Sequence, residues 1–551
     1  MTKVGRHGVC VFWHDERPYA VDDRCPHLGF PLHRGSIEDG LLTCHWHHAR
    51  FDLASGGTLD PFADDVRTYP VEVVDGRVLV GVPATVETAD PLLTRLDEGL
   101  EQGLTLVLAK AVLGLIDAGV PSAEVIRRGV AFGTAHRGEG WGAGLTVLVA
   151  MANLIDQLDP ADRALALVHG LTWVSRDTRG HPDRFGLAPL GGTAIGADRL
   201  ERWYRRFVGT RATDAAERTL ATALGVLTRP EVERIMFAAA SDHVFVDEGH
   251  TVDFTNKAFE CLDHLGWDAA AIVTSLVAQT AHASRSEEGG SWRHPDDLAA
   301  LAAEASERIL AGGTASLEGR GVADQQLVDL AWHVLDDDPT SSVEHLLVAL
   351  AQGATPEQLG RAVALAAGLR VTRFGVQNDH GDWDVVHHGF TYANAVHQAL
   401  RRAPSVALLR AVVHGALRVH LDRFLNIPAA RVPSVEGNLA ALADCWDREG
   451  QVDRAGGIVH AWIREGGDPR AAVARLGRAL LAEDAGFHWF QIVEAAARQG
   501  AAWPAGSEPQ ALLLAGAARF VAAHTPTRRE LPQVVRIAQR LRRGDDLFAE
   551  G

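Results

Sequence analysis

The chain has 551 residues, a formal net charge of −18 and only five cysteines. Such a charge argues against nucleic acid or anionic lipid as a partner. Few cysteines without a signal-peptide pattern argue against a disulfide framework. No apolar run is long enough and free enough of charge to span a membrane. We therefore expect a cytoplasmic protein with no membrane partner and no nucleic-acid partner.

Residues 1–82 predict a small all-β domain, because segments such as VRTYPVEVVDGRVLVGV alternate apolar and polar residues around a glycine turn. Two short motifs within it each join one cysteine and one histidine. They supply four candidate ligands: Cys25, His27, Cys44 and His47. Two cysteines and two histidines at this spacing can hold one tetrahedral zinc or a 2Fe-2S cluster with both histidines on one iron.

Both motifs, their separation and the trailing hairpin closely resemble the Rieske 2Fe-2S family over about residues 1–85. The resemblance implies a 2Fe-2S cluster bound by Cys25, His27, Cys44 and His47. High-potential members carry a Ser and a Tyr after the second motif, where this chain has Ala49 and Phe51, and an extra cysteine pair that is missing here. The resemblance is thus to the ferredoxin and oxygenase branch, with a reduction potential of about −150 mV. His48 is expected to be solvated or to contact a ligand residue, or instead to meet a redox partner or the other domain.

Residues 83–91 begin and end with proline and predict a linker. Residues 92–551 are rich in Ala, Leu, Val and Arg, with the i, i+3, i+4, i+7 spacing of helices in LTLVLAKAVLGLIDAG and similar segments. The predicted fold is therefore multidomain: a small all-β Rieske domain, then a large all-α domain of repeated helical hairpins.

Four segments of the helical region share a plan of helix, glycine break and helix, and they start near residues 110, 257, 345 and 460. The residues at these starts are Lys110, Lys257, His345 and His460. A histidine also recurs near the end of three copies: His136, His282 and His380. Equivalent positions in stacked repeats can converge on one cavity. The chain has only three Lys against fifty Arg. A lysine at the same position in two repeats, Lys110 and Lys257, therefore indicates that an amine is needed there and that a guanidinium cannot replace it.

Three segments, VEHLLVALAQGATPEQL, FTNKAFECLDHLG and HGDWDVVHHGFTYANAVHQAL, resemble the questin-oxidase-like family. That resemblance implies an α-helical, His-ligated non-haem iron oxygenase that acts on aromatic polyketides, in some members with a carboxylated lysine as a further ligand. This chain departs from the family in its fused Rieske domain and at Lys257, which follows Asn256 where the family more often reads Asn-His.

Helix geometry limits which residues can share an ion. Four candidate residues recur every seven positions: His243, His250, Lys257 and His264. On a single helix they would form one stripe, with successive members about 10.5 Å apart along the helix axis. At most one or two of these can belong to one site. A helix expected from near Trp383 points His387 and His388 to different sides, and His388 is the favoured ligand. The further candidates for a second iron are His345, His414 and Lys257, with Glu139, Asp382 and Asp384 as carboxylate alternatives.

The leading hypothesis is a Rieske oxidoreductase with Lys257 and His388 as candidate catalytic residues. Its cluster would take electrons from a ferredoxin or flavin reductase and pass them to a His-ligated non-haem iron in the helical domain, which would oxygenate a small aromatic or polyketide-like substrate. One alternative is an electron-transfer or redox-sensing protein whose helices form a docking surface without a second metal. Another is an enzyme that uses acid/base chemistry of His and Asp. The β-rich iron domain common beside Rieske domains is not predicted, since alternating strands are missing after residue 85.

Overall fold

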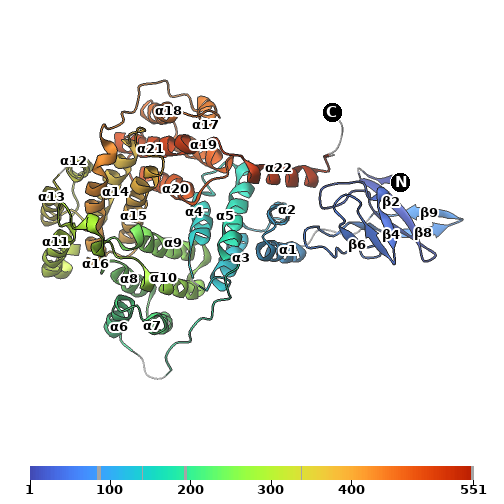
Figure 1. Cartoon of the computed structure of the whole chain (residues 1–551), viewed down its shortest axis with the longest axis horizontal. Coiled ribbons are helices and arrows are strands. Elements are labelled where there is room, and N and C mark those ends of the chain that lie inside the picture. The colour runs from blue at the N-terminus through green and yellow to red at the C-terminus, as the bar shows by residue number, and fades with distance from the viewer. Residues whose placement is uncertain are drawn as a thin grey trace. The chain divides into compact units, whose positions relative to one another are not determined.

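The computed structural model describes residues 1–5, 7–82, 89–138, 140–191, 195–336, 338–545 and 547 (Figure 1). The chain divides into two compact units. Unit 1 contains residues 1–132, 164–179 and 529–551, and unit 2 contains residues 133–163 and 180–528. Within the described ranges, no helix is both long and apolar enough to cross a membrane.

The β domain of unit 1 contains two small antiparallel sheets and a separate hairpin. The first sheet has the order β1 (Thr2–Val4), β2 (His7–His14), β3 (Arg17–Asp22), β7 (Thr68–Tyr69). The second has the order β4 (Ser36–Glu38), β5 (Leu41–Thr43), β6 (Arg50–Asp52). The hairpin pairs β8 (Val71–Val74) with β9 (Arg77–Val80), as the alternation of residues 66–82 predicted.

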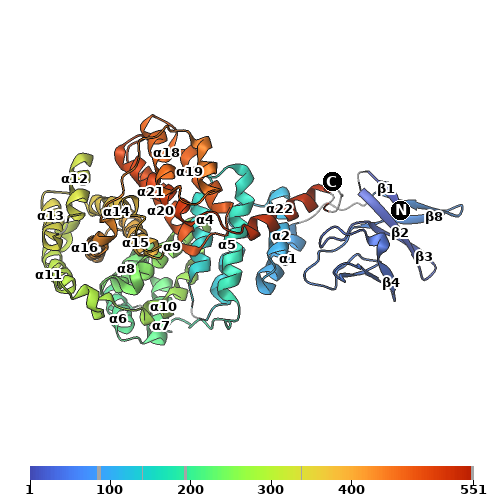
Figure 2. The same ribbon diagram turned by 45° about the horizontal axis from the view of Figure 1, so that its top comes forward.

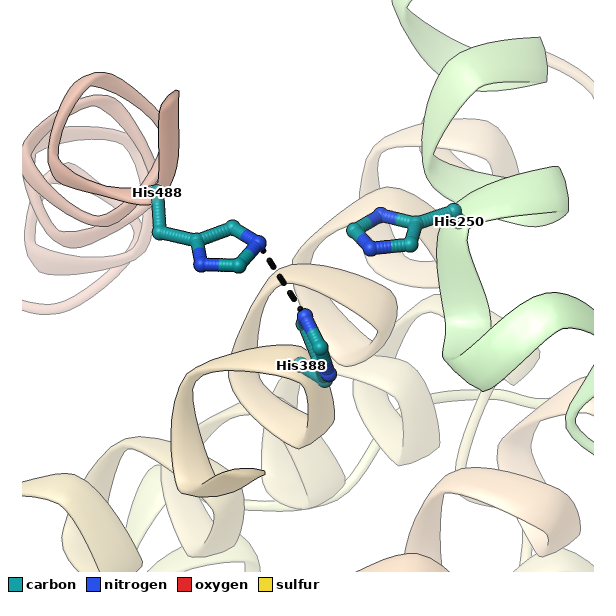
Figure 3. Close-up of side chains that lie close together, drawn as sticks. All are labelled: His250, His388 and His488. Carbon is teal, nitrogen blue, oxygen red and sulfur yellow. Dashed lines mark hydrogen bonds between the residues drawn. The ribbon is translucent and has the colours of Figure 1, made fainter. Parts of the chain in front are cut away.

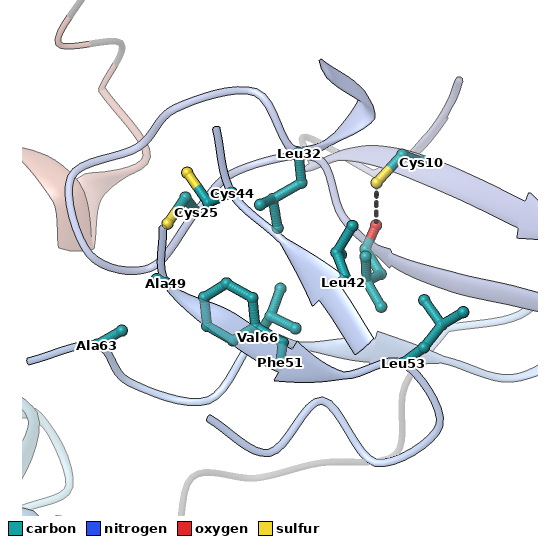
Figure 4. Packing of buried hydrophobic residues seen from close by; sticks show 11 residues of the cluster. Cys10, Cys25, Leu32, Leu42, Cys44, Ala49, Phe51, Leu53, Ala63 and Val66 are labelled. Carbon is teal, nitrogen blue, oxygen red and sulfur yellow. Dashed lines mark hydrogen bonds between the residues drawn. The ribbon is translucent and has the colours of Figure 1, made fainter. Parts of the chain in front are cut away.

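The core of the β domain includes the cysteines of both motifs, which lie at one side of the cluster in Figure 4. Leu42 of β5 pairs with Phe51 of β6, and both are fully buried together with Leu32. Cys25 and Cys44 belong to the same buried group. The sheets therefore bring the cysteine loops together at one end of an apolar core.

Beyond β9, the described residues form helices and loops without further strands, so the predicted change from a small β domain to a large all-α region is confirmed. Unit 1 contains α1 (Ala89–Gln102), α2 (Thr105–Asp117), most of α3 (Ser122–Ala135), α5 (Arg163–Thr178) and α22 (Glu530–Arg543). Unit 2 contains α4 (Ala143–Leu154), α6 (Ala197–Gly209), α7 (Thr213–Val226), α8 (Arg229–Ala240), α9 (His250–Leu265), α10 (Val277–His282), α11 (Leu298–Gly312), α12 (Asp324–Val334), α13 (Pro339–Ala351), α14 (Pro356–Thr372), α15 (Asp382–Arg402), α16 (Val406–Leu421), α17 (Leu442–Trp446), α18 (Val452–Arg464), α19 (Pro469–Leu481), α20 (Phe487–Ala501) and α21 (Glu508–His524).

The predicted linker at residues 83–91 is only partly seen. Residues 83–88 lie outside the described ranges, and residues 89–91 form the first turn of α1.

Helix α22 also belongs to unit 1, where it packs against α2. Arg542 of α22 forms an ion pair with Asp117 of α2, and Arg24 of the β domain donates to the Leu541 carbonyl at 3.2 Å.

The four predicted hairpin segments share a stereochemical feature. Each first helix ends at or just before a glycine with positive φ, a conformation that L-residues rarely adopt. These glycines are Gly119 (φ +75°), Gly266 (φ +89°), Gly353 (φ +101°) and Gly466 (φ +87°). A second α-helix follows each one: α3, α10, α14 and α19. In the second segment a 3-10 helix at Trp267–Leu276 comes first.

Candidate functional site

The two cysteine motifs form loops of the same construction. In each, the peptide N–H four residues after the cysteine donates back to the cysteine carbonyl: Gly29 to Cys25 at 2.7 Å, and His48 to Cys44 at 3.0 Å. Gly29 and His48 both have positive φ, +85° and +59°. His48 therefore takes the backbone place that glycine takes in the first loop, a role that its sequence neighbourhood did not reveal.

The four side chains of the motifs lie in two pairs, one of thiols and one of imidazoles. A hydrogen bond between the two buried thiols lowers the pKa of Cys44 to about 6 and raises that of Cys25. The rings of His27 and His47 lie edge to face with their centres 4.8 Å apart. Nδ1 of His27 is buried, and no described residue gives it a hydrogen-bond partner. Two thiols and two imidazoles with an uncommitted buried nitrogen suit the ligand set of a 2Fe-2S cluster with two histidines on one iron.

A second group of metal-binding side chains lies in unit 2. His250 of α9, His388 of α15 and His488 of α20 place their ligand nitrogens within 4.8 Å of one another. Figure 3 shows the three rings converging from three different helices, with Nε2 of His388 3.1 Å from Nε2 of His488. We call these residues the histidine triad. Among the described residues, no other group of three or more His, Cys, Asp or Glu meets this spacing.

The helices that carry the triad lie side by side in unit 2 (Figure 1, Figure 2). Helix α9 begins at His250 because Gly249, with φ +97°, breaks the backbone before it. The expected stripe from His243 to His264 is therefore wrong at its start: His243 precedes the helix and pairs with Glu287 at 2.6 Å. Helix α15 begins at Asp382, close to the predicted position.

Two carboxylates orient triad rings. Asp384 Oδ1 lies 2.9 Å from Nδ1 of His488, and Glu248 Oε2 lies 3.4 Å from Nδ1 of His388. A carboxylate that accepts the Nδ1 proton leaves Nε2 free as a metal ligand and fixes the plane of the ring. Asp384, considered as a ligand from the sequence, is placed as the hydrogen-bond partner of a histidine.

Two histidines of the triad are shifted towards their neutral form. Burial lowers the pKa of His250 to about 4, with the neighbouring His488 as a further cause. Burial, His250 and His488 lower the pKa of His388 to about 2. These two imidazoles are neutral near pH 7, and a neutral imidazole is the form that binds metals.

His387 has another partner although it adjoins a triad residue. Its Nε2 lies 3.2 Å from Oε1 of Gln491, and the Gln491 amide donates to the carboxylate of Asp253. Burial raises the pKa of Asp253 to about 7. His387, Gln491 and Asp253 thus form a buried hydrogen-bonded chain beside the triad.

Lys257 is placed in an ionic network and outside the triad. Its ammonium is 1% exposed and donates to Glu260 and Glu494, each at 2.8 Å. Burial alone would lower the pKa of Lys257, but these carboxylates raise it above its ordinary value. Asn153 also donates to both carboxylates. Lys257 lies about 10.5 Å from His250 along α9, so the two do not share an ion.

The remaining predicted ligands are not brought to the triad. The ring of His345 stacks on His333 at 4.0 Å, and its Nδ1 donates to the Ser341 carbonyl at 2.8 Å. His414 is buried in α16, where burial and Arg410 lower its pKa to about 3. The two repeat lysines have different partners: Lys110 contacts His27 and Asp64, whereas Lys257 contacts Glu260 and Glu494. Glu139 lies outside the described residues.

The structure adds His250 and His488 to the predicted His388. The seven-residue spacing had drawn attention to His250, but no periodic partner or family motif marked His488. It is one of 26 histidines, and only the packing of α20 against α15 brings it to the site.

The β domain, with its paired thiols and imidazoles, defines a class of protein: one that binds an iron–sulfur cluster for electron transfer. Residues 1–70 match the family described as Rieske [2Fe-2S] domain. The chain belongs to the Rieske family through this domain.

Curated relatives share the same region. The ferredoxin component of the alkene monooxygenase system of Xanthobacter autotrophicus is 37% identical over 79 residues, which cover 14% of this chain and 65% of the relative. The anthranilate 1,2-dioxygenase ferredoxin subunit of Burkholderia cepacia is 34% identical over 80 residues, 14% of this chain and 74% of the relative. The 4beta-methylsterol monooxygenase of Methylococcus capsulatus is 36% identical over 95 residues, 15% of this chain and 26% of the relative. The chain thus spans just under two thirds of the first relative.

Proposed function

We propose that the chain is a Rieske oxidoreductase that passes electrons to a non-haem iron bound by the histidine triad, for the oxygenation of a small organic substrate. The observation that carries this proposal is the convergence of His250, His388 and His488 in a chain that also has a Rieske domain. The named relatives of that domain are an oxygenase ferredoxin component, a dioxygenase ferredoxin subunit and a monooxygenase, which supports an oxygenase role.

The side chains suit these two groups. The cluster would supply single electrons and the iron would activate dioxygen. Three imidazoles leave coordination positions free for substrate or dioxygen, as open metal sites require. The rings of Phe254 and Phe487 lie 5.3 and 5.7 Å from the ring of His250, so the triad has two apolar neighbours. Asp384 accepts a hydrogen bond from Nδ1 of His488, and Glu248 lies 3.4 Å from Nδ1 of His388.

The electron donor would approach the exposed edge of the β domain. His47 and Trp46 are exposed, Trp46 to 41%, and their rings lie 4.1 Å apart. A ferredoxin or a flavin reductase is the class of donor that a Rieske cluster in an oxygenase system requires. An aromatic or polyketide-like substrate is proposed from the resemblance of the helical region to the questin-oxidase-like family.

A second candidate is an electron-transfer or redox-sensing protein in which the helices form a docking surface. The ferredoxin components among its relatives favour this candidate, because the similarity is confined to the cluster domain. It differs from the first proposal in requiring no metal at the triad.

The iron and acid-labile sulfide content of anaerobically purified full-length protein separates the two candidates. The oxygenase proposal predicts about three irons and two sulfides per chain. Cys44→Ala should lose the sulfide and keep one iron, whereas His388→Ala should lose one iron and keep the sulfide. His345→Ala, which changes a histidine away from the triad, is the matched control and should lose neither. If the wild type contains two irons per chain and Cys44→Ala contains none, the result would favour the docking candidate.

A further inference from the structure

Helix α2 of unit 1 contacts the first cysteine motif directly. The ammonium of Lys110 donates to the backbone carbonyls of Pro26 and His27, the latter at 3.1 Å. It also lies 2.9 Å from Oδ2 of Asp64 in the same β domain. The Lys110 side chain is only 13% exposed, so this charge is held between α2 and the loop that carries two of the four cluster ligands.

Helix α1 holds the adjoining loop in the same way. Arg95 donates to the carbonyls of Pro61 and Ala63 at 3.0 and 2.9 Å and to Asp64 at 3.2 Å. Between these two carbonyls stands Phe62, whose ring centre lies 5.0 Å from that of His27. Two cations from α1 and α2 therefore fix the backbone and the packing around His27.

The two histidine ligands consequently have different surroundings. His47 is exposed, whereas His27 is partly buried and has Lys110 at its own carbonyl. Lys110 and Arg95 lie outside residues 1–70, the part that matches the Rieske family. The helical region thus adds a positive charge beside the cluster ligands that the family domain does not itself contain.

We propose that Lys110 is a positioning residue of the cluster: it fixes the loop of Cys25 and His27, and its ammonium favours the reduced cluster. One-electron reduction by an external reductase adds one negative charge to the cluster and breaks no bond. A cation held nearby stabilises that added charge by Coulomb attraction, and the effect is strong where water is excluded. This inference rests on the electron-transfer role proposed above, and it needs no metal at the triad.

The test is a potentiometric titration of the cluster in full-length protein, followed by its electron paramagnetic resonance signal. Lys110→Met should lower the equilibrium constant for reduction at least tenfold, which is about 59 mV for one electron. Lys110→Arg keeps the charge and should restore most of the potential. Lys3→Met removes a lysine from the exposed strand β1 and should match the wild type.

Asp64→Asn provides a test of opposite sign. It removes a negative charge beside Lys110 and should raise the potential, so the idea remains testable if Lys110→Met fails to hold its cluster. Equal potentials for wild type, Lys110→Met and Asp64→Asn would overturn the proposal. If only Asp64→Asn can be titrated, a potential equal to that of the wild type would also overturn the proposal. Iron counts at the triad are measured separately, so failure of the oxygenase proposal leaves this result unaffected.

Discussion

Nε2 of His388 and Nε2 of His488 lie 3.1 Å apart, although 100 positions separate the two residues in the chain. The opposite ring nitrogens, Nδ1 of each, face the carboxylates Glu248 and Asp384. Each ring thus has one nitrogen facing a carboxylate and one directed at the other ring. A cation bound between the two Nε2 atoms would replace their close contact with bonds that both imidazoles can make.

Asp384 should strengthen metal binding through His488. Asp384→Asn is expected to weaken the affinity of the triad for iron by about 10- to 100-fold, since hydrogen-bond partners of ligand histidines have effects of this size. Competition with a chelator measures the change. Asp382→Asn alters a carboxylate of the same helical turn and serves as the control. Equal iron affinities in both variants would contradict this role.

Lys257 should be essential for stability and dispensable for iron. Lys257→Met leaves Glu260 and Glu494 with fewer cations in a buried site, a change that costs about 3–5 kcal/mol in free energy of unfolding. Urea denaturation measures this cost, with Lys3→Met as the control for loss of a lysine. The oxygenase proposal also expects the folded variant to keep its triad iron. Loss of that iron without loss of stability would contradict the placement of Lys257 outside the iron site.

His414 should make the protein sensitive to acid. Its pKa is about 3 in the fold against an ordinary 6.5, so below pH 6.5 the unfolded chain binds a proton that the fold does not. The stabilisation is present above pH 6.5 and is lost as the pH falls towards 3. His414→Gln should reduce the slope of unfolding free energy against pH by up to about 1.4 kcal/mol per pH unit. An unchanged slope would contradict the burial of a neutral His414.

Asp253 should act with the opposite sign. Its pKa is about 7 in the fold against an ordinary 3.8, so the fold holds a proton that the unfolded chain releases. This contribution is present below about pH 3.8 and is lost as the pH rises through about 7. Asp253→Asn, which is neutral at every pH, should therefore flatten the loss of stability between pH 4 and pH 7. Chemical denaturation at several pH values measures both slopes.

The residues after the second motif should keep the cluster potential low. Ala49 and Phe51 are fully buried in the core that contains Cys25 and Cys44, where a Ser and a Tyr would bring hydroxyl donors. Hydrogen bonds to cluster sulfurs raise a Rieske potential. The wild type is expected near about −150 mV, and Ala49→Ser and Phe51→Tyr should each titrate at a higher potential. Variants that titrate with the wild type would show that these hydroxyls do not reach the sulfurs.

Local patterns predicted the parts of the molecule that local geometry controls. The cysteine and histidine spacings lie within single loops, and residue periodicity separated the β domain from the helices and placed the start of α15. The prediction that His243 begins a helical stripe was wrong, because residues 245 and 247–249 have positive φ and no helix can run through them into α9. His488 could not be found, since its place depends on the packing of three helices far apart in sequence.

Lysine scarcity indicated that two amines are needed, but the reasons for them differ. Glu260 and Glu494 surround Lys257, and Glu494 lies 237 positions away from it. Lys110 instead reaches backbone carbonyls of the cysteine loop, 84 and 83 positions away. Repeat position alone could not distinguish these surroundings, because the partners come from elsewhere in the chain.

Helix α22 gives the molecule an order of assembly. Arg542 of α22 and its partner Asp117 of α2 are 425 positions apart, and both belong to unit 1. During synthesis on the ribosome the β domain can pair all its strands early, whereas α2 is complete before the whole of unit 2 and α22 follows it. Unit 1 is therefore completed only after unit 2, although its β domain precedes unit 2 in the chain. A nascent chain halted within unit 2 would contain the cluster ligands and α1 but would lack α22, the second helix that packs against α2.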